Sequence, residues 1–490
     1  MEAREDLCFF PAHRLAADIA AGTLSSRDAV AAHLERIARL NGRLNAVVSL
    51  DADRARERAR EADAALGRGE PWGPLHGLPV TIKDTFDVAG LRTTYGHRLS
   101  GRNVPARNAT VVERLVAAGA IVLGHTNVPE GAHDWQCVSP FFGRTSNPWD
   151  LARTPGGSSG GAAAALAAGL SPLDIGSDAA GSIRVPAHFC GVFALKPTEN
   201  RVPATGHSVI PGMLRPFRRI VCYGPIARTV ADLSLVLPLI EGPDGHDWEV
   251  PPPPPMSPDS HAPRRFALSF GPFPLDDGVR RVIQGAAARL REAGHTVDER
   301  DPPGFDFKEA LDVWGRILGA EVGGAMPAPL RVMWRAILGP RYGRSAWSRG
   351  YVAGLGGGMR SYAKALERRD RLIGAAEAFL SSYDAWLLPA AATAAFTHRR
   401  IGARIRVNRQ KVAYSLSNGA HCCAIGVLGA PVVSIPAGLD EERVPVGFQM
   451  VARRWRDMEL LDVAADVERA LGGFRAPPAH DVCSSVLGER

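Results

Sequence analysis

The sequence predicts an α/β fold in which helices cover both faces of a central sheet. Short apolar runs of the kind found in buried strands alternate along the chain with longer segments whose apolar residues recur at helical spacing. The 490 residues are 46% hydrophobic, which is ample for a deep core. Either one large domain or two or three smaller ones are therefore expected.

The first half of the chain begins with a helical region. Residues 10–67 are expected to be helical, because 27–40 has apolar positions at helical spacing and 51–66 is rich in Ala, Arg and Glu. A turn and a short apolar strand follow, and this strand ends at Lys83. The elements expected next are a helix over 111–120, a strand over 121–124, an alanine-rich helix over 162–168, strands at 174–175 and 193–195, and a helix over 230–239.

The second half follows a proline-rich stretch at 251–260, which predicts a stiff, exposed connector. Residues 305–382 are expected to be mostly helical, with a glycine-rich interruption at 354–358. The other elements expected here are strands over 265–270, 385–388, 432–434 and 446–449 and helices over 278–293 and 458–471. The predicted organisation is an N-terminal helical region (1–67), a core (68–250), a connector (251–262), a C-terminal part of the same domain with a helical insertion near the substrate (263–476), and a tail (477–490).

Composition argues against several classes of function. The net charge is only +7 and no basic tract is interleaved with aromatic residues, so nucleic acid is not an expected partner. The charged N-terminus lacks the apolar segment of a signal peptide. The longest uncharged apolar run, 422–439, is broken by Gly429, Pro431 and Pro436, which favours a buried strand with turns over a membrane span. No membrane partner is therefore expected.

Cysteine and histidine patterns indicate neither disulfides nor a metal. The seven cysteines contain no Cys-x-x-Cys pair, which is typical of reduced thiols in a cytoplasmic protein. No His-Glu-x-x-His motif is present, and His133-Asp134 has no partner at ligand spacing. The run 421–423 is better explained by packing of a buried segment than by metal or thiol chemistry.

Lys83 is one of only five lysines, and it follows the apolar residues Val80-Thr81-Ile82. Burial disfavours the charged form of a lysine and lowers its pKa. A desolvated lysine beside hydroxyl groups can then remove a proton from a serine. The alternative is a lysine at the end of a surface strand, paired with Asp84.

Two glycine-framed serine clusters, 156–161 (GGSSGG) and 177–184 (SDAAGSIR), flank the alanine-rich helix. Ser182 follows a strand at a bend, where its Oγ and successive backbone amides would provide a nucleophile with an oxyanion hole. Ser158 and Ser159 could relay a proton or cap the helix. A structural or phosphate-binding turn is the alternative, although no Gly-x-x-x-x-Gly-Lys-Ser/Thr motif is present.

Together these motifs resemble the amidase signature family, over roughly residues 10–475. The resemblance also rests on LHGLPVTIKD (75–84), FGRTSNPW (142–149), FCGVFALKPT (189–198), GPIARTVAD (224–232) and GAPVVSIPAG (429–438). It implies the family's fold, with a central, mostly parallel, mixed and twisted sheet.

The resemblance further implies a Ser–cisSer–Lys triad. Ser182 would be the nucleophile, Ser158 the bridging serine after a cis peptide bond, and Lys83 the general base. The reaction would be hydrolysis of the carboxamide of a small molecule through an acyl-enzyme, without a metal or organic cofactor. The resemblance also implies that the oxyanion hole is formed by the backbone amides of Ala179, Ala180, Gly181 and Ser182. It further implies that the nucleophile loop is supported by Ser159, Asp178 and Arg184.

Two positions depart from the family pattern. Ala180 stands where the family usually has glycine, and its methyl group narrows the site and restricts φ. If φ is negative there, little is lost, and otherwise the oxyanion hole must shift. His125 stands where lysine is common in the family.

The substrate pocket is expected in variable loops, with Trp135, Gln136, Phe142, Ser415 and Asn418 as candidate lining residues. The favoured interpretation is a cytoplasmic small-molecule amidase, either a monomer or a homodimer. The alternatives are acyl transfer to an amine acceptor, the glutaminase subunit of a tRNA-dependent amidotransferase, and a catalytically impaired binding protein.

Overall fold

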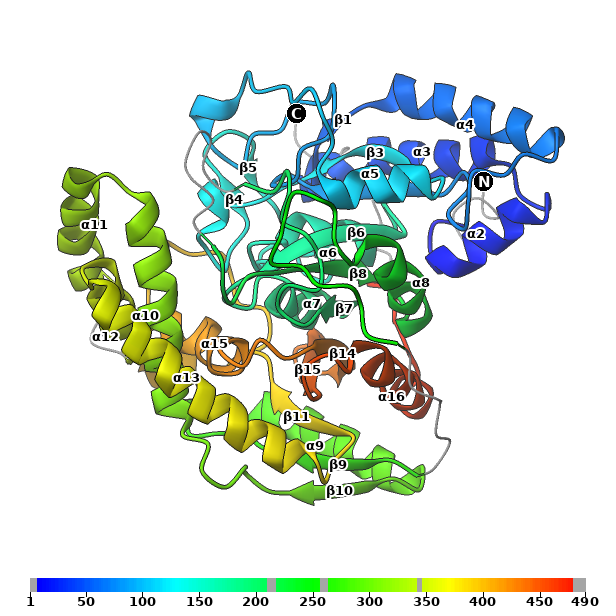
Figure 1. Ribbon diagram of the computed structural model, residues 1–490. Coiled ribbons are helices and arrows are strands. Elements are labelled where there is room, and N and C mark those ends of the chain that lie inside the picture. Colours follow the sequence, from blue (N-terminus) through cyan, green and yellow to red (C-terminus); the bar gives the residue numbers. More distant parts are fainter. Residues whose placement is uncertain (1–6, 209–216, 256–262, 342–345, 479–490) are drawn as a thin grey trace, which may run out of the picture.

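The computed structural model describes residues 7–208, 217–255, 263–341 and 346–478, which fold around one 11-stranded sheet (Figure 1). Its strands are β1 (Val47–Leu50), β2 (Pro79–Lys83), β3 (Ile121–Thr126), β6 (Leu173–Asp178), β7 (Phe193–Lys196), β8 (Cys222–Ala227), β9 (Arg265–Leu268), β10 (Thr296–Glu299), β11 (Ala385–Pro389), β14 (Val432–Leu439) and β15 (Pro445–Val451). Their order across the sheet is β1-β3-β2-β6-β8-β7-β14-β15-β11-β9-β10. The short hairpins β4 (Val138–Ser139) with β5 (Gly143–Arg144), and β12 (Ile405–Val407) with β13 (Gln410–Val412), lie outside it.

The sheet is mixed, as expected, but antiparallel pairings outnumber parallel ones. Parallel pairing is confined to β3-β2-β6 at one end and β11-β9-β10 at the other. The pairings between β6 and β11 are all antiparallel, and so is that of β1 with β3. The sheet is mixed as expected but lacks the expected parallel majority, because the four central strands β8, β7, β14 and β15 each run antiparallel to both neighbours.

Helices cover both faces of the sheet, which confirms the α/β prediction (Figure 1). They are α2 (Ala12–Ala20), α3 (Ser26–Leu44), α4 (Ala52–Gly67), α5 (Thr110–Ala117), α6 (Gly160–Ala167), α7 (Arg184–Cys190), α8 (Val230–Ile240), α9 (Asp277–Glu292), α10 (Phe307–Ala325), α11 (Ala328–Arg341), α12 (Ala346–Leu355), α13 (Met359–Leu380), α14 (Tyr414–Asn418), α15 (Ala420–Gly426) and α16 (Asp457–Leu471). Two 3₁₀ turns are η1 (Arg98–Ser100) and η2 (Glu130–Ala132).

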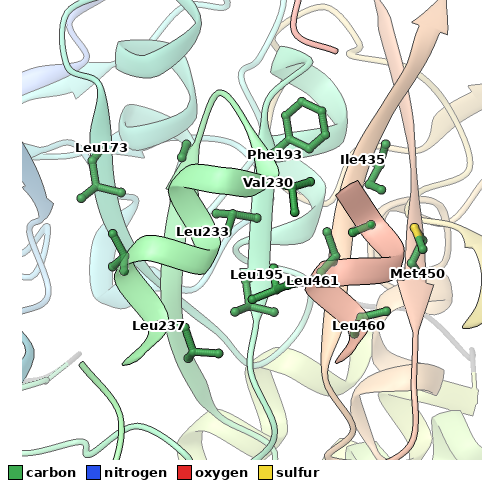
Figure 2. Packing of buried hydrophobic residues seen from close by; sticks show 14 of the residues in the cluster. Leu173, Phe193, Leu195, Val230, Leu233, Leu237, Ile435, Met450, Leu460 and Leu461 are labelled. Carbon is green, nitrogen blue, oxygen red and sulfur yellow. The ribbon is translucent and has the colours of Figure 1, made fainter. Parts of the chain in front are cut away.

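Alternation along the strands separates the two faces. In β7, Phe193 and Leu195 join the core formed with α5, α8, α9 and α16, whereas Ala194 packs against α6 and α7 on the opposite face. Figure 2 shows the first of these faces, where α8 and α16 lie over the strands. The second face holds α6 and α7, the two helices that begin at the C-terminal ends of the serine clusters.

Several local predictions need correction. Residues 47–50 are not helical but form β1, because they pair with β3. Residues 420–426 form α15 rather than part of a buried strand, although 432–439 does form β14. Gly354 lies inside α12, so the glycine-rich interruption is shorter than expected. The end of the proline-rich connector (256–262) and most of the tail (479–490) lie outside the described residues.

Among the described residues, no helix combines the length and the hydropathy needed to cross a membrane. In the same part of the chain, no group of His, Cys, Asp or Glu side chains is placed to hold a metal ion.

Candidate functional site

Lys83 is the last residue of β2, and every residue of this strand is buried. Its side chain has no solvent exposure. The Nζ donates hydrogen bonds to Ser158 Oγ at 2.8 Å, to Ser177 Oγ at 3.0 Å and to the Ser177 carbonyl oxygen at 3.3 Å. Lys83 therefore lies between the two serine clusters and contacts both.

Burial lowers the pKa of Lys83 to about 7, although the carboxylates of Asp178 and Asp174 act in the opposite direction. Near neutral pH a substantial fraction of this lysine is therefore uncharged and able to accept a proton. The alternative of a surface pair with Asp84 does not occur. Asp84 is itself buried and accepts hydrogen bonds from the backbone and hydroxyl of Thr94.

The first serine cluster forms a tight loop before α6. The peptide bond between Gly157 and Ser158 is cis. A side chain at position 157 has no room, because a Cβ there would lie 2.4 Å from the carbonyl oxygen of Asp134. Ser158 Oγ accepts the bond from Lys83, and Ser159 Oγ makes no capping bond to α6. Neither serine side chain therefore caps the helix.

The second serine cluster connects β6 to α7, and Ser182 is 9% exposed within it. The backbone N–H of Ser159 donates to the carbonyl oxygen of Ser182 at 3.0 Å. This bond joins the two loops directly beside Ser158. The loop that holds Ser182 is therefore fixed against the loop that contacts Lys83.

Asp178 and Arg184 hold the nucleophile loop from inside. The Asp178 carboxylate accepts hydrogen bonds from the Arg184 guanidinium at 2.8 and 3.0 Å and from the backbone N–H groups of Gly181 and Ile183. Burial alone would raise the pKa of Asp178, but the Arg184 charge and these hydrogen bonds outweigh it and hold the pKa well below its usual range. Arg184 also donates to Gln449 Oε1. Both side chains of this pair are fully buried.

One of the four backbone amides expected in the oxyanion hole already donates a hydrogen bond within the protein. The Gly181 amide donates to Asp178 Oδ1 at 2.9 Å, so it is not available to a developing negative charge. Gly181 instead provides conformation, because its φ is +94° and a Cβ would lie 2.9 Å from Cys422 Sγ. Within the described chain, no hydrogen bond uses the amides of Ala179, Ala180 or Ser182.

Two indole groups hold the carbonyls of this loop. Trp314, from α10, donates from Nε1 to the Ala179 oxygen at 3.0 Å, and Trp135 donates to the Ala180 oxygen at 2.9 Å. Because a carbonyl and the following amide point in opposite directions across a trans peptide, the bond from Trp314 also fixes the direction of the Ala180 N–H.

The structure describes both residues that depart from the family pattern. Ala180 does not adopt a positive φ, so its methyl group causes no backbone strain. His125 is buried in β3, with Nδ1 3.1 Å from the Ile82 oxygen and Nε2 3.1 Å from Thr93 Oγ1. Burial lowers the pKa of His125 to about 4, so it is neutral at physiological pH.

Four of the five predicted pocket residues come together around Tyr414. The Tyr414 ring lies edge-on to Trp135, its hydroxyl is 3.4 Å from Gln136 Nε2, and Ser415 and Asn418 belong to the same short helix, α14. Phe142 does not join them. It lies in the β4–β5 turn, where its ring contacts Phe141 and its backbone oxygen accepts from Asn45.

The sequence did not single out Ser177, Asp134 or Tyr414 for the site. Ser177 stands inside the second serine cluster, so the cluster itself was the signal for it. Asp134 and Tyr414 are separated by 280 residues, but the Tyr414 hydroxyl donates to Asp134 Oδ1 at 2.5 Å. No pattern in the sequence relates these two residues.

Over almost the whole chain, the protein is similar to amidases and to related amidotransferase subunits. A family model described as Amidase matches residues 28–461. The chain is 34% identical to a glutamyl-tRNA(Gln) amidotransferase subunit of Moorella thermoacetica, over 96% of this chain and 99% of the relative. It is 33% identical to an acylamidase of Rhodococcus erythropolis, over 95% and 96%. The solved structure of a 6-aminohexanoate cyclic dimer hydrolase with its substrate matches with a TM-score of 0.79 and 27% identity, over 96% and 99%.

Proposed function

The chain belongs to the amidase signature family of hydrolases that act on amide bonds, and on that premise we propose that it hydrolyses small-molecule carboxamides with a Ser182–Ser158–Lys83 triad. Ser182 is the nucleophile, Ser158 relays the proton and neutral Lys83 is the general base. The amides of Ala179, Ala180 and Ser182 stabilise the oxyanion. Nucleophile and base are both side chains, so these steps need no metal or organic cofactor.

In the first half of the proposed reaction, Ser182 Oγ attacks the carbonyl carbon of the substrate. The Ser182 proton passes to Ser158 Oγ, while Ser158 gives its own proton to Lys83 Nζ. The tetrahedral intermediate then breaks its C–N bond, and the proton returns from Lys83 through Ser158 to the leaving amine. In the second half, water attacks the acyl ester with the same relay, which releases the acid and restores Ser182.

The observation that carries the proposal is the hydrogen bond of 2.8 Å between Lys83 Nζ and Ser158 Oγ, made by a lysine whose burial lowers its pKa to about 7. A lysine with this pKa is poised as a base at neutral pH. The bond from Ser159 to Ser182 supports the same assignment, because it holds the nucleophile loop beside this pair.

The test is hydrolysis of aryl, aliphatic and amino-acid amides by the purified protein and its variants. Ser182→Ala is expected to abolish turnover, and Lys83→Ala and Ser158→Ala to lower kcat by about a thousandfold or more. Because the three groups act as a unit, a double variant should be little worse than either single variant. Ser434→Ala, which changes another buried serine in β14, is the matched control and should keep its activity. Full activity in Ser182→Ala would exclude the proposed nucleophile.

A second candidate is the glutaminase subunit of a tRNA-dependent amidotransferase. It is favoured by the full-length identity of 34% to a component of such an enzyme. Release of ammonia from glutamine, measured alone and with the companion subunits of such a complex, separates the two candidates. Transfer of the acyl group to hydroxylamine tests whether an amine can replace water in the second half of the reaction.

A further inference from the structure

We infer that this site selects amides that carry an ammonium group, and that Asp134 is the residue that binds that group. The inference rests on the proposed function, because it concerns the substrate of the same site. Asp134 takes no part in the proposed chemical steps. Its position, its unpaired oxygen and its surroundings are three separate observations that lead to the inference.

Asp134 lies beside both serine loops. Its backbone oxygen would be 2.4 Å from a Cβ on Gly157, the residue before Ser158. The next residue, Trp135, donates from its indole to the Ala180 oxygen in the loop of Ser182. The dipeptide 134–135 therefore contacts the loop of the nucleophile and the loop of the bridging serine at the same time. These contacts place residue 134 next to the reacting centre, as the inference requires of a residue that binds part of the substrate.

The Asp134 carboxylate is only half satisfied. The side chain is buried, with the residue 7% exposed, and Oδ1 accepts from the Trp135 backbone at 2.8 Å and from the Tyr414 hydroxyl at 2.5 Å. Oδ2 has no hydrogen-bond partner within bonding distance among the described residues, although the Gln136 backbone N–H also acts on the carboxylate and lowers its pKa. A buried carboxylate oxygen needs a donor. A ligand that brings N–H groups and a positive charge supplies one.

The surroundings favour a cation over a neutral or anionic group. Ser415 Oγ and the Asn418 Oδ1 acceptor on α14 are also buried without a partner in the described structure. The neighbouring Trp135 and Tyr414 rings, whose centroids lie 5.8 Å apart, make these surroundings aromatic, and aromatic rings attract ammonium groups. Burial raises the pKa of Asp134 to about 6, against the opposing effect of the Tyr414 hydrogen bond. The carboxylate therefore carries its charge at and above neutral pH, which excludes an acidic substrate group from this position.

The test compares pairs of amides that differ in charge but not in size. Ser182 is labelled with a fluorophosphonate and quantified by mass spectrometry, in the presence of ω-amino amides (glycinamide to 6-aminohexanamide) or alkyl amides with the same number of heavy atoms (propanamide to heptanamide). The best ω-amino amide should slow labelling at a concentration about tenfold lower than its alkyl counterpart, because a charge-assisted hydrogen bond contributes about this factor. This comparison needs no turnover.

Two variants assign the preference to Asp134. Asp134→Asn should abolish the tenfold difference. Asp87→Asn is the matched control and should keep it, because the half-buried carboxylate of Asp87 likewise accepts from a tyrosine hydroxyl, that of Tyr95 at 2.8 Å. Equal or weaker protection by the ω-amino amides in the unmodified protein overturns the inference, and so does a difference that survives Asp134→Asn. Absence of any Ser182 labelling overturns the proposed function itself, whereas labelling without a charge preference overturns only this inference.

Discussion

Protonation of Lys83 is expected to inactivate the enzyme below neutral pH. Burial lowers the pKa of this lysine from 10.5 to about 7, and the side chain has no exposure to solvent that would screen the effect. About half of the molecules then have a neutral lysine at pH 7, and the neutral fraction falls about tenfold for each pH unit below that. A lysine of ordinary pKa would be neutral in only about 0.03% of molecules at pH 7. Burial therefore increases the competent population by about 1,500-fold.

The assay is kcat/KM for an uncharged amide, and the rate of fluorophosphonate labelling of Ser182, between pH 5 and 9. Both should rise with a slope of one and reach half of their plateau near pH 7. Asp174 tests the assignment, because its negative charge raises the pKa of Lys83. Burial also raises the pKa of Asp174 itself to about 7, so only part of this charge is present at the midpoint. Asp174→Asn should therefore move the midpoint to lower pH. A flat profile from pH 5 to 7, a midpoint near 10, or loss of the titration in Asp174→Asn would refute the role of Lys83.

Three further predictions concern stability. Lys83→Met should remove activity but stabilise the fold by about 2 kcal/mol at pH 6, since the cost of burying the charge exceeds the hydrogen bonds lost. The full cost of burying the charge is present below pH 7, where the lysine is charged in both the folded and the unfolded state. The cost disappears as the pH rises to the pKa of the lysine in the unfolded state. Urea denaturation at pH 6 and pH 10 should therefore show the gain in stability only at pH 6. Gly181→Ala should cost about 2–3 kcal/mol in thermal unfolding, because its φ is +94° and a Cβ would meet Cys422, whereas Ala180→Gly should change stability by less than about 1 kcal/mol. Arg184→Met should cost about 3–5 kcal/mol in urea denaturation, because it leaves Asp178 buried and unpaired, and a cost below 1 kcal/mol would show that this pair does not hold the loop.

Features encoded in short contiguous motifs were predictable from the sequence. The apolar strand ending at Lys83, the glycine-framed serine loops and the helix between them are all local patterns, and the structure has each of them. The hydrogen bond between Lys83 and Ser158 follows from β2 and α6 packing together at β6. That Lys83 and Ser158 lie together was expected from the family resemblance that these motifs carry, since the motifs alone left a surface lysine and a structural turn as alternatives.

Features that depend on tertiary partners were not predictable. The segment Val47–Leu50 lies within a region that the sequence predicts to be helical. It forms a strand because it pairs with β3, which is distant in the sequence. The hydrogen bond from the Gly181 amide to Asp178 could not be predicted either, because it depends on the folded conformation of the loop. Asp134 and Tyr414 meet across 280 residues, and neither residue type at these positions indicates the other.

The most direct test of the account is the site and pH dependence of covalent labelling by a fluorophosphonate. Intact-mass analysis followed by peptide mapping should find one adduct, on Ser182, that forms faster as the pH rises through 7. The adduct should be absent from Ser182→Ala and should form at least about a hundredfold more slowly in Lys83→Met, while Ser434→Ala should react like the unmodified protein. An adduct on another residue, or labelling of Ser182 at an unchanged rate in Lys83→Met, would contradict the proposed triad.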